Sequence, residues 1–328
     1  MTVSMPNFTL ARPPDIEAAI AARANDSSSL YLAGGTDLIV NLQHGLEQPT
    51  VLIDLSGIDE LHQLSMTATG VRIGACTTLA TLATEPAIRD RYHAVAQAAG
   101  TVASPSTRSL ATLGGNLCLQ TRCIYYNQSE WWRRSNNYCL KRQGDTCHVA
   151  PQGQHCHAAF SGDLAPALMI LDADVEIAGK TQRRRIKLAD LYREDGRAHL
   201  TLDVEEILVA VYLPPDPPPS CYAKTRVRGA IDFPSAGAAV ALTAENGRTT
   251  LLRVGLTGTN SRPFLLQGTE TLLGRALDLY ALRQLESLVQ KQVQPMRTTT
   301  ASAHYRRLAA AALVGRLAAT LAAGRGLS

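Results

Sequence analysis

The chain has 328 residues, 45% of them hydrophobic and 18% charged, which is typical of globular proteins and excludes a collagen, a coiled coil or a disordered chain. This length predicts two or three domains. The net charge of +4 is too small for a nucleic-acid-binding protein, and most of it lies in residues 122–157, which carry five Lys or Arg against two Asp or Glu. The same segment holds four of the seven cysteines.

The chain shows no feature of a membrane or secreted protein. It has no run of 18 apolar residues, and its first ten residues lack the basic and apolar regions of a signal peptide. We therefore expect a cytoplasmic protein that does not bind membranes. In a reducing cytosol the seven cysteines are expected to be thiols or metal ligands rather than disulfides.

The first 57 residues predict a small unit of strands and one helix. Asp15 is a candidate N-cap, and the apolar residues that follow it predict a helix over 15–24. An apolar run then enters a Gly-Gly turn and continues after it. Residues 50–58 alternate between polar and apolar side chains, as in a strand.

The next unit is expected over 58–217. Residues 71–80 have a strand-and-turn pattern, and 81–100 have helical periodicity, with the helix expected to give way at Ser104–Pro105. Residues 161–177 predict a short capped helix that enters a strand. Further strands are expected over 183–192 and 205–214.

A proline-rich linker, PPDPPPS at 214–220, separates this unit from the C-terminal one, because consecutive prolines sustain neither a helix nor a central strand. The C-terminal unit, 218–328, predicts strands over 237–245 and 249–257 and helices over 276–291 and 301–324. Four leucines at near-helical spacing predict the core-facing side of the last helix: Leu308, Leu313, Leu317 and Leu321.

Three short motifs suit a nucleotide site. In AGGTDL at 33–38, successive N–H groups of the glycines can converge on an anion beside the hydroxyl of Thr36. ATLGGN at 111–116 again ends in Gly-Gly and a polar residue. Asp163 is placed either to accept hydrogen bonds from the ribose hydroxyls of a nucleotide or to cap the helix that follows it. Each motif alone fits an ordinary turn or cap equally well, and neither GxGxxG nor GxxxxGK[ST] occurs.

Taken in order, six motifs resemble a known family: AGGTDL, GACTTL, ATLGGN, GDLAPAL, EEILVAVYLP and YAKTRVR. They resemble the FAD-binding subunits of the molybdenum hydroxylases, the xanthine oxidase and carbon monoxide dehydrogenase group, from Phe8 to about Ala323. The resemblance implies an α+β protein with a flavin-binding fold of the vanillyl-alcohol-oxidase (PCMH) type. Its two subdomains would be 1–57 and 58–217, followed by an α+β domain of the CO dehydrogenase flavoprotein type at 218–328.

The resemblance also implies the residues that bind FAD, and no catalytic residue, because the substrate site of the family lies on a partner subunit. Two glycine loops would cradle the pyrophosphate, an aspartate would bind the adenosine ribose, and two residues would lie by the isoalloxazine. In that order these are Ala33, Gly34, Gly35, Thr36, Asp37, Gly115 and Asn116, then Asp163, then Leu208 and Lys224, with Thr77 as a weaker match.

One segment departs from the family. Relatives join GGN to the aspartate helix by a short connection, whereas 46 residues separate Asn116 from Asp163 here. Thiolates around a metal would explain so long an insertion with so little apolar core. The intervals between Cys123, Cys139, Cys147 and Cys156 contain no CxxC, so spacing leaves an iron–sulfur cluster and zinc both open. Unrelated thiols and disulfides are the alternatives. Three histidines are either further ligands or solvated loop residues: His148, His155 and His157.

A cysteine-bearing insertion at this place resembles the flavoprotein subunits of 4-hydroxybenzoyl-CoA reductases, which carry an additional 4Fe-4S cluster. That match implies that the ligands are Cys123, Cys139, Cys147 and Cys156. Cys118 would be a buried strand thiol, and Cys76 and Cys221 would be inert core thiols.

The implied function is electron transfer in an oxidoreductase that dehydroxylates 4-hydroxybenzoyl-CoA to benzoyl-CoA. Electrons would pass from ferredoxin through the 4Fe-4S cluster and FAD to a small subunit with two 2Fe-2S clusters and a large molybdopterin-binding subunit, in a dimer of heterotrimers (a heterohexamer). The alternatives are the FAD subunit of another molybdenum hydroxylase, a self-contained flavin oxidase, and a zinc-stabilised binding module.

The insertion also predicts a docking surface. Its basic residues are candidates to receive an acidic ferredoxin, and a plain solvated loop is the alternative. The two tryptophans, Trp131 and Trp132, are expected to cover the cluster or a partner surface. The basic residues concerned are Arg133, Arg134, Lys141 and Arg142.

Overall fold

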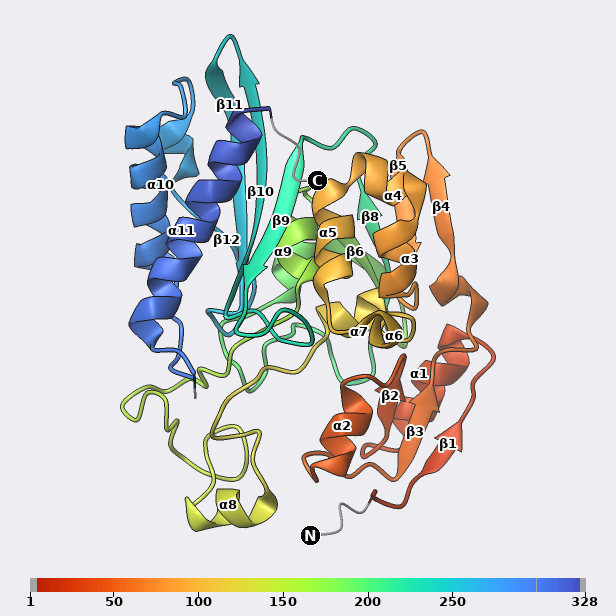
Figure 1. Ribbon diagram of the computed structural model, residues 1–328. Helices are drawn as coiled ribbons and strands as arrows, with labels where there is room; N and C mark the ends of the chain where they lie inside the picture. Colours follow the sequence, from red (N-terminus) through yellow and green to blue (C-terminus); the bar gives the residue numbers. More distant parts are fainter. Residues whose placement is uncertain (1–4, 299, 325–328) are drawn as a thin grey trace.

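The computed structural model describes residues 5–298 and 300–324. Three sheets follow one another along the chain (Figure 1). The first is parallel, in the order β1-β3-β2. Asp15 caps its first helix by accepting from Ala18 N, which confirms the predicted start. The elements are β1 (Thr9–Ala11), α1 (Ile16–Asn25), β2 (Leu30–Leu32), α2 (Leu38–Gln43) and β3 (Val51–Asp54).

The second sheet has five strands in the order β4-β5-β8-β6-β7, and every neighbouring pair is antiparallel. Its centre is β8, whose seven residues are mostly buried, as its continuous apolar run predicts. The elements are η1 (Asp59–His62), β4 (Leu64–Thr67), β5 (Gly70–Gly74), β6 (Asp174–Ala178), β7 (Arg183–Lys187), η2 (Leu188–Leu191) and β8 (Ile207–Leu213).

The helix predicted over 81–100 is in fact three helices. Pro86 begins the second of them, because proline at the first turn needs no N–H partner but cannot continue a preceding helix. The last of the three ends at Thr101, just before the predicted break at Ser104–Pro105, and Ser104 then caps a new short helix, which was not predicted, by accepting from Thr107 N. The helices of this unit are α3 (Leu79–Thr84), α4 (Pro86–Arg91), α5 (His93–Thr101), α6 (Pro105–Arg108), α7 (Leu113–Leu117) and α9 (Leu164–Met169).

The third sheet is antiparallel, in the order β12-β11-β10-β9, and α10 and α11 cover one of its faces (Figure 1). The sequence analysis missed β9, which directly follows the prolines. The elements are β9 (Ser220–Thr225), β10 (Ala236–Glu245), β11 (Arg248–Thr257), β12 (Phe264–Leu265), η3 (Thr269–Leu272), α10 (Leu279–Gln292) and α11 (Ala303–Ala322).

The other face of the third sheet packs against the second unit. Tyr222, Ala239 and Ala241 belong to the same apolar core as α5 and α9. Gly255 lies so close to Pro166 that an added Cβ would be 2.6 Å from its carbonyl oxygen. In α11, Leu313 and Leu317 are buried as predicted, but Leu308 is 42% exposed because it lies on the outer side of the helix. None of the described helices is long and apolar enough to cross a membrane.

Candidate functional site

A cavity of about 860 Å³ is lined by residues from all three units, which is a size typical of cofactor sites. Ten of the eleven residues predicted to bind FAD line it: Ala33, Gly34, Gly35, Thr36, Asp37, Gly115, Asn116, Asp163, Leu208 and Lys224. Thr77 is the exception. It lies next in sequence to Cys76, a lining residue, and its buried hydroxyl has no hydrogen-bond partner among the residues that the structure describes.

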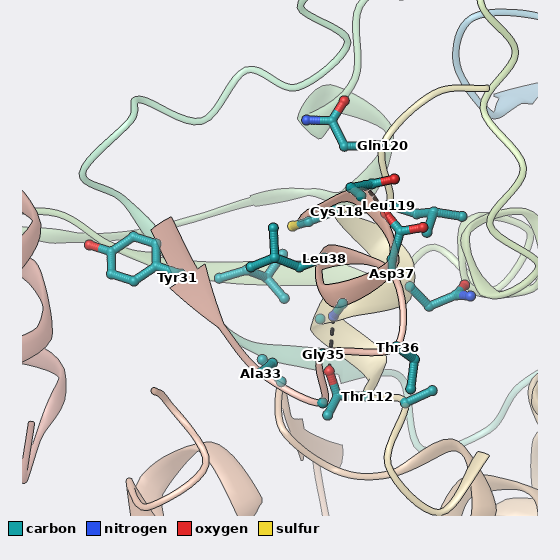
Figure 2. Close-up of a pocket in the computed structure, with 18 of the residues that line it drawn as sticks. Tyr31, Ala33, Gly35, Thr36, Asp37, Leu38, Thr112, Cys118, Leu119 and Gln120 are labelled. Atoms are coloured by element: carbon teal, nitrogen blue, oxygen red, sulfur yellow. Dashed lines mark hydrogen bonds between the residues drawn. The ribbon is translucent and has the colours of Figure 1, made fainter. Parts of the chain in front are cut away.

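The first glycine loop joins β2 to α2 along the cavity wall, and Figure 2 shows its residues across from Cys118, Leu119 and Gln120. Gly35 has a φ of 70°, in the left-handed region that favours glycine. Gly34 has no room for a side chain, because a Cβ would lie 1.8 Å from the carbonyl oxygen of Leu110. Glycine is therefore required at both positions, at Gly34 by the close approach of the backbone at Leu110 and at Gly35 by the left-handed φ.

The second glycine loop lies in α7. Thr112 caps this helix by accepting from Gly115 N at 3.1 Å. At Gly114 an added Cβ would lie 2.8 Å from the Cβ of Ala75, so the helix approaches that segment closely. Asn116 accepts a hydrogen bond from Leu164 N at 3.0 Å and thereby holds the start of α9.

Asp163 precedes α9 but does not cap it with its side chain, so the capping interpretation is wrong. Its carboxylate is buried instead, with the Tyr222 hydroxyl donating to Oδ1 and Lys224 Nζ donating to Oδ2 at 3.1 Å. Burial raises the pKa of Asp163, and the charge of Lys224 opposes that rise. Because Tyr222 and Lys224 lie on β9, this cluster ties the third sheet to the cavity.

Three further lining residues were not predicted from the sequence. Tyr31 lines the cavity and donates to the carbonyl oxygen of Glu205 at 2.8 Å. Ile231 and Phe233 of the loop after β9 also line the cavity and are largely exposed. Tyr31 stands three residues before Gly34, in the run that leads to the Gly-Gly turn, which was a usable signal, but the loop after β9 carries no periodic pattern.

The cysteine-bearing insertion leaves and re-enters the fold at one place. Arg122 and Ala159 exchange backbone hydrogen bonds of 2.7 and 2.8 Å, which closes the insertion at its base. Arg142 donates to the carbonyl oxygen of Leu46 at 2.7 Å, just after α2. The insertion, which contains α8 (Glu130–Ser135), is thus folded onto the segment that carries the first glycine loop.

The four cysteines predicted as metal ligands, Cys123, Cys139, Cys147 and Cys156, line one small cavity of about 10 Å³ inside the insertion. All four are free thiols. Burial raises the pKa of Cys123 to about 11, and it also raises that of Cys156. Within residues 5–298 and 300–324, no three His, Cys, Asp or Glu side chains are arranged to hold a single metal ion.

The backbone around these cysteines is held from several sides. Asn127 accepts from Cys123 N at 2.9 Å, and Asp195 accepts from Cys156 N at 3.2 Å. Ser261 of the third unit donates to the carbonyl oxygen of Cys156 at 2.9 Å. A Cβ on Gly144 would lie 2.8 Å from Cys139 N, so a glycine is needed where the chain turns around this cysteine.

The remaining cysteines lie in other surroundings, Cys76 and Cys221 buried and Cys118 half-buried. Burial raises the pKa of Cys76 and of Cys221 to about 12, as expected for inert core thiols. Cys118 is not a strand residue as predicted, because it follows α7 as its C-cap. It lines the large cavity rather than the small one.

Most of the predicted docking cations are structural, which corrects the expectation of a basic surface. Arg133 is 1% exposed and pairs with Glu130 at 2.7 Å. Lys141 donates to the carbonyl oxygen of Thr121 at 3.0 Å, and Arg142 is held by Leu46. Of the four, only Arg134 is exposed. Backbone carbonyl oxygens in the insertion and next to it accept hydrogen bonds from these cations, because buried carbonyl groups need donors.

Aromatic rings line the small cavity, but neither of the two tryptophans does, so their expected role as a cover of the cluster stays a prediction. The ring of Trp132 lies 6.2 Å from that of Tyr125, which in turn lies 5.3 Å from His148. Tyr125 and His148 line the cavity. Trp131, in contrast, is 66% exposed.

Comparisons with known proteins agree along the whole chain. Residues 6–216 match the family of FAD-binding domains in molybdopterin dehydrogenases, and residues 220–321 match the CO dehydrogenase flavoprotein C-terminal domain. The FAD-binding subunit PaoB of an Escherichia coli aldehyde oxidoreductase is 32% identical over 270 residues, covering 79% of this chain and 83% of that one. The carbon monoxide dehydrogenase medium chain of Afipia carboxidovorans is 26% identical over 314 residues, covering 94% and 95%.

Solved structures show the same fold. A chain of carbon monoxide dehydrogenase from Hydrogenophaga pseudoflava superimposes with a TM-score of 0.82 at 21% identity, covering 98% of this chain and all of that one. A chain of the Cu,Mo-CO dehydrogenase gives a TM-score of 0.80 at 24% identity, covering 98% and 99%.

Proposed function

This chain belongs to the family of FAD-binding subunits of the molybdenum hydroxylases, and from that premise we propose that it relays electrons to a molybdenum site on a partner subunit. The expected fold, a flavin-binding part followed by a CO dehydrogenase flavoprotein domain, is confirmed by the two family matches and the superpositions. The division at 57 and 217 is part of the proposal, supported by the three separate sheets.

FAD, when bound, supplies a group that takes up and releases electrons. The cavity has a size that suits FAD, and Gly34 and Gly35 in its wall form a turn that only glycines can make, since a Cβ would clash with Leu110 at Gly34 and strain the left-handed backbone at Gly35. We assign the pyrophosphate to these two residues with Ala33, Thr36 and Asp37, and to Gly115 with Asn116. Thr77 stays in the proposed FAD-binding set without a defined contact: it lies beside the cavity lining, and its hydroxyl lacks a partner within the described residues.

We assign the adenosine ribose to Asp163, whose ionised carboxylate keeps acceptor positions beside those used by Tyr222 and Lys224. Leu208 and Lys224 are assigned to the isoalloxazine. Both line the cavity on strands that the core holds rigidly, β8 and β9.

The single observation that carries the metal proposal is the meeting of four cysteines, far apart in sequence, around one cavity in the insertion. Four soft thiols without a disulfide fit an iron–sulfur cluster. We therefore propose that Cys123, Cys139, Cys147 and Cys156 hold a 4Fe-4S cluster. The hydrogen bonds from Asn127, Asp195 and Ser261 would fix the backbone of two of the four.

We further propose that the enzyme is a 4-hydroxybenzoyl-CoA reductase, because the cysteine-bearing insertion between the two flavin motifs is what this chain shares with that group. The partners would be a molybdopterin-binding large subunit and a 2Fe-2S small subunit in a dimer of heterotrimers. Ferredoxin is proposed as the donor, since removing a hydroxyl from an electron-rich ring requires a strong reductant. The FAD subunit of another molybdenum hydroxylase is the alternative.

The test begins with anaerobic purification of the native complex and identification of its chains by peptide mass spectrometry. One FAD and four iron atoms per copy of this chain are expected, with a flavin spectrum above a broad iron–sulfur shoulder. Zinc in place of iron would refute the cluster. Oxidation of an aldehyde, with no dehydroxylation of 4-hydroxybenzoyl-CoA, would refute the reductase and leave the flavin role intact.

A further inference from the structure

Lys141 lies where the two proposed cofactor sites adjoin. It is one of the residues that line the four-cysteine cavity. Its ammonium donates to the side-chain and main-chain oxygens of Thr121 and makes a longer contact of 3.4 Å with the side-chain oxygen of Gln120. Gln120 lines the large cavity, so one side chain touches the walls of both.

The ammonium of Lys141 has unusual surroundings for a charge. Its side chain is half-buried, so that water reaches it only in part. Among the residues that the structure describes, its partners are neutral: oxygens of Thr121 and Gln120, and the ring of Tyr126 at 4.6 Å from Nζ. A cation removed from water is costly unless a negative group compensates it.

Two of the predicted ligands, Cys123 and Cys156, line the same small cavity as Lys141, and as free thiols they carry no charge. Glu47 is itself poorly suited to balance this charge, since burial raises its pKa and Arg142 acts on it more strongly than Lys141 does. The surroundings of Lys141 therefore lack a counter-charge that thiolate ligands would provide.

We propose that Lys141 is the fixed counter-charge of the metal group on the four cysteines and raises its reduction potential. This rests on the proposed function, because it presupposes the cluster. Each electron that the group gains adds one negative charge, and a nearby cation in a region of low polarity stabilises the reduced form more than the oxidised form. Lys141 is thus a positioning residue: it acts through its charge on the metal group and does not contact the substrate.

The chain offers a matched control. Arg134 lies in the same insertion and carries the same charge, but its side chain is exposed. Solvent and salt screen an exposed charge strongly. Removing Arg134 therefore changes the net charge as much as removing Lys141 does, without changing the charge beside the cavity.

The experiment compares anaerobically purified full-length wild type with Lys141→Met, Lys141→Arg and Arg134→Gln. Iron and flavin contents are measured first, and the midpoint potential of the cluster is then followed by absorbance and electron paramagnetic resonance. For Lys141→Met we expect the equilibrium constant for cluster reduction to fall about tenfold or more, which is about 59 mV for one electron. Lys141→Arg and Arg134→Gln should stay close to wild type.

The possible outcomes separate the role of Lys141 from the existence of the cluster. Absence of iron from the wild type would refute the proposed cluster itself. An unchanged potential in Lys141→Met with full iron, or an equal shift in Arg134→Gln, would overturn the role of Lys141 and leave the cluster standing. If Lys141→Met loses its iron, the Lys141→Arg variant decides the question. Iron retained by Lys141→Arg would show that a positive charge is needed at this position. Iron lost from Lys141→Arg as well would show that only the shape of the lysine side chain matters, and would overturn the proposal.

Discussion

Lys224 and Asp163 form a salt bridge of 3.1 Å in which both side chains are almost completely buried, at 2% and 3% exposure. It joins β9 of the third sheet to the start of α9 in the second unit. Because Tyr222 donates to the same carboxylate, the pair is part of a satisfied buried network at the wall of the flavin cavity.

Replacing Lys224 with Met should destabilise the protein by about 3–5 kcal/mol near neutral pH, since it leaves a buried carboxylate without its cation. Burial already raises the pKa of Asp163, and losing Lys224 raises it further. A raised folded pKa means that stability is regained as the carboxylate is protonated at lower pH. Thermal unfolding at pH 5 and pH 8 should therefore show the smaller deficit at pH 5, with exposed Lys180→Met as the control.

Gly34→Ala should empty the flavin site. Its Cβ would lie 1.8 Å from the carbonyl oxygen of Leu110, so the loop must move away from the geometry that faces the cavity. We expect flavin occupancy to fall roughly tenfold or more, because overpacking of this kind costs on the order of 1–3 kcal/mol. The measurement is flavin absorbance per chain after gel filtration. Gly57→Ala, with no atom within 4 Å of the added Cβ, serves as control, and full occupancy in Gly34→Ala would refute the assignment.

Cys139→Ser should abolish iron binding and expose the insertion to protease, because metal binding and local folding are coupled. Cys76→Ser should keep its iron, since this buried thiol lies outside the four-cysteine cavity. Iron analysis and limited proteolysis of the two variants measure the difference. Equal iron contents in both would exclude Cys139 as a ligand.

Arg133 and Arg134 are neighbours in sequence with opposite surroundings. Arg133 is buried, pairs with Glu130 and contacts the carbonyl oxygen of Gly45 at 3.4 Å, whereas Arg134 is exposed. Arg133→Met should weaken the insertion by about 2–3 kcal/mol, the loss expected for charged hydrogen bonds. Proteolysis rates of the insertion should rise in this variant and remain at the wild-type level in Arg134→Gln. Similar rates in both would show that Arg133 is not an anchor.

His199 should make stability depend on pH. It is 3% exposed, and burial lowers its pKa from 6.5 to about 4. Because the folded pKa lies below the unfolded one, its contribution is fully present above pH 6.5 and is lost as the pH falls toward 4. The loss should total about 3 kcal/mol. Denaturant unfolding between pH 4 and 7 should show a flatter profile in His199→Gln than in exposed His93→Gln.

Regular patterns in the sequence predicted most of the fold. Asp15, the alternation around β3 and the apolar run of β8 each gave a local signal that the structure confirms. The break at Pro86 was readable but was overlooked because the alanines around it keep helical periodicity. β9 was missed because it directly follows the prolines and its six residues show no alternation of polar and apolar side chains.

The candidate sites, like the fold, could be predicted only where a local pattern in the sequence marks them. The glycine motifs were visible because glycine marks a close approach of the backbone, and the structure places them in one cavity. Which of the basic side chains are buried could not be predicted from the sequence. Nothing in the order of Arg133, Arg134 and Lys141 tells which one turns inward, because that depends on carbonyl groups supplied by the folded insertion.

The pairing of β5 with β8 has a consequence for biosynthesis. Val71 pairs with Leu213, so the ribosome must complete the whole insertion before the second sheet can close. The chain that surrounds the four cysteines also needs Ser261, which is made later still. The thiols therefore leave the ribosome unprotected, before the layers that cover them exist. Oxygen exposure during translation should lower the yield of iron-loaded protein far more than the same exposure after folding.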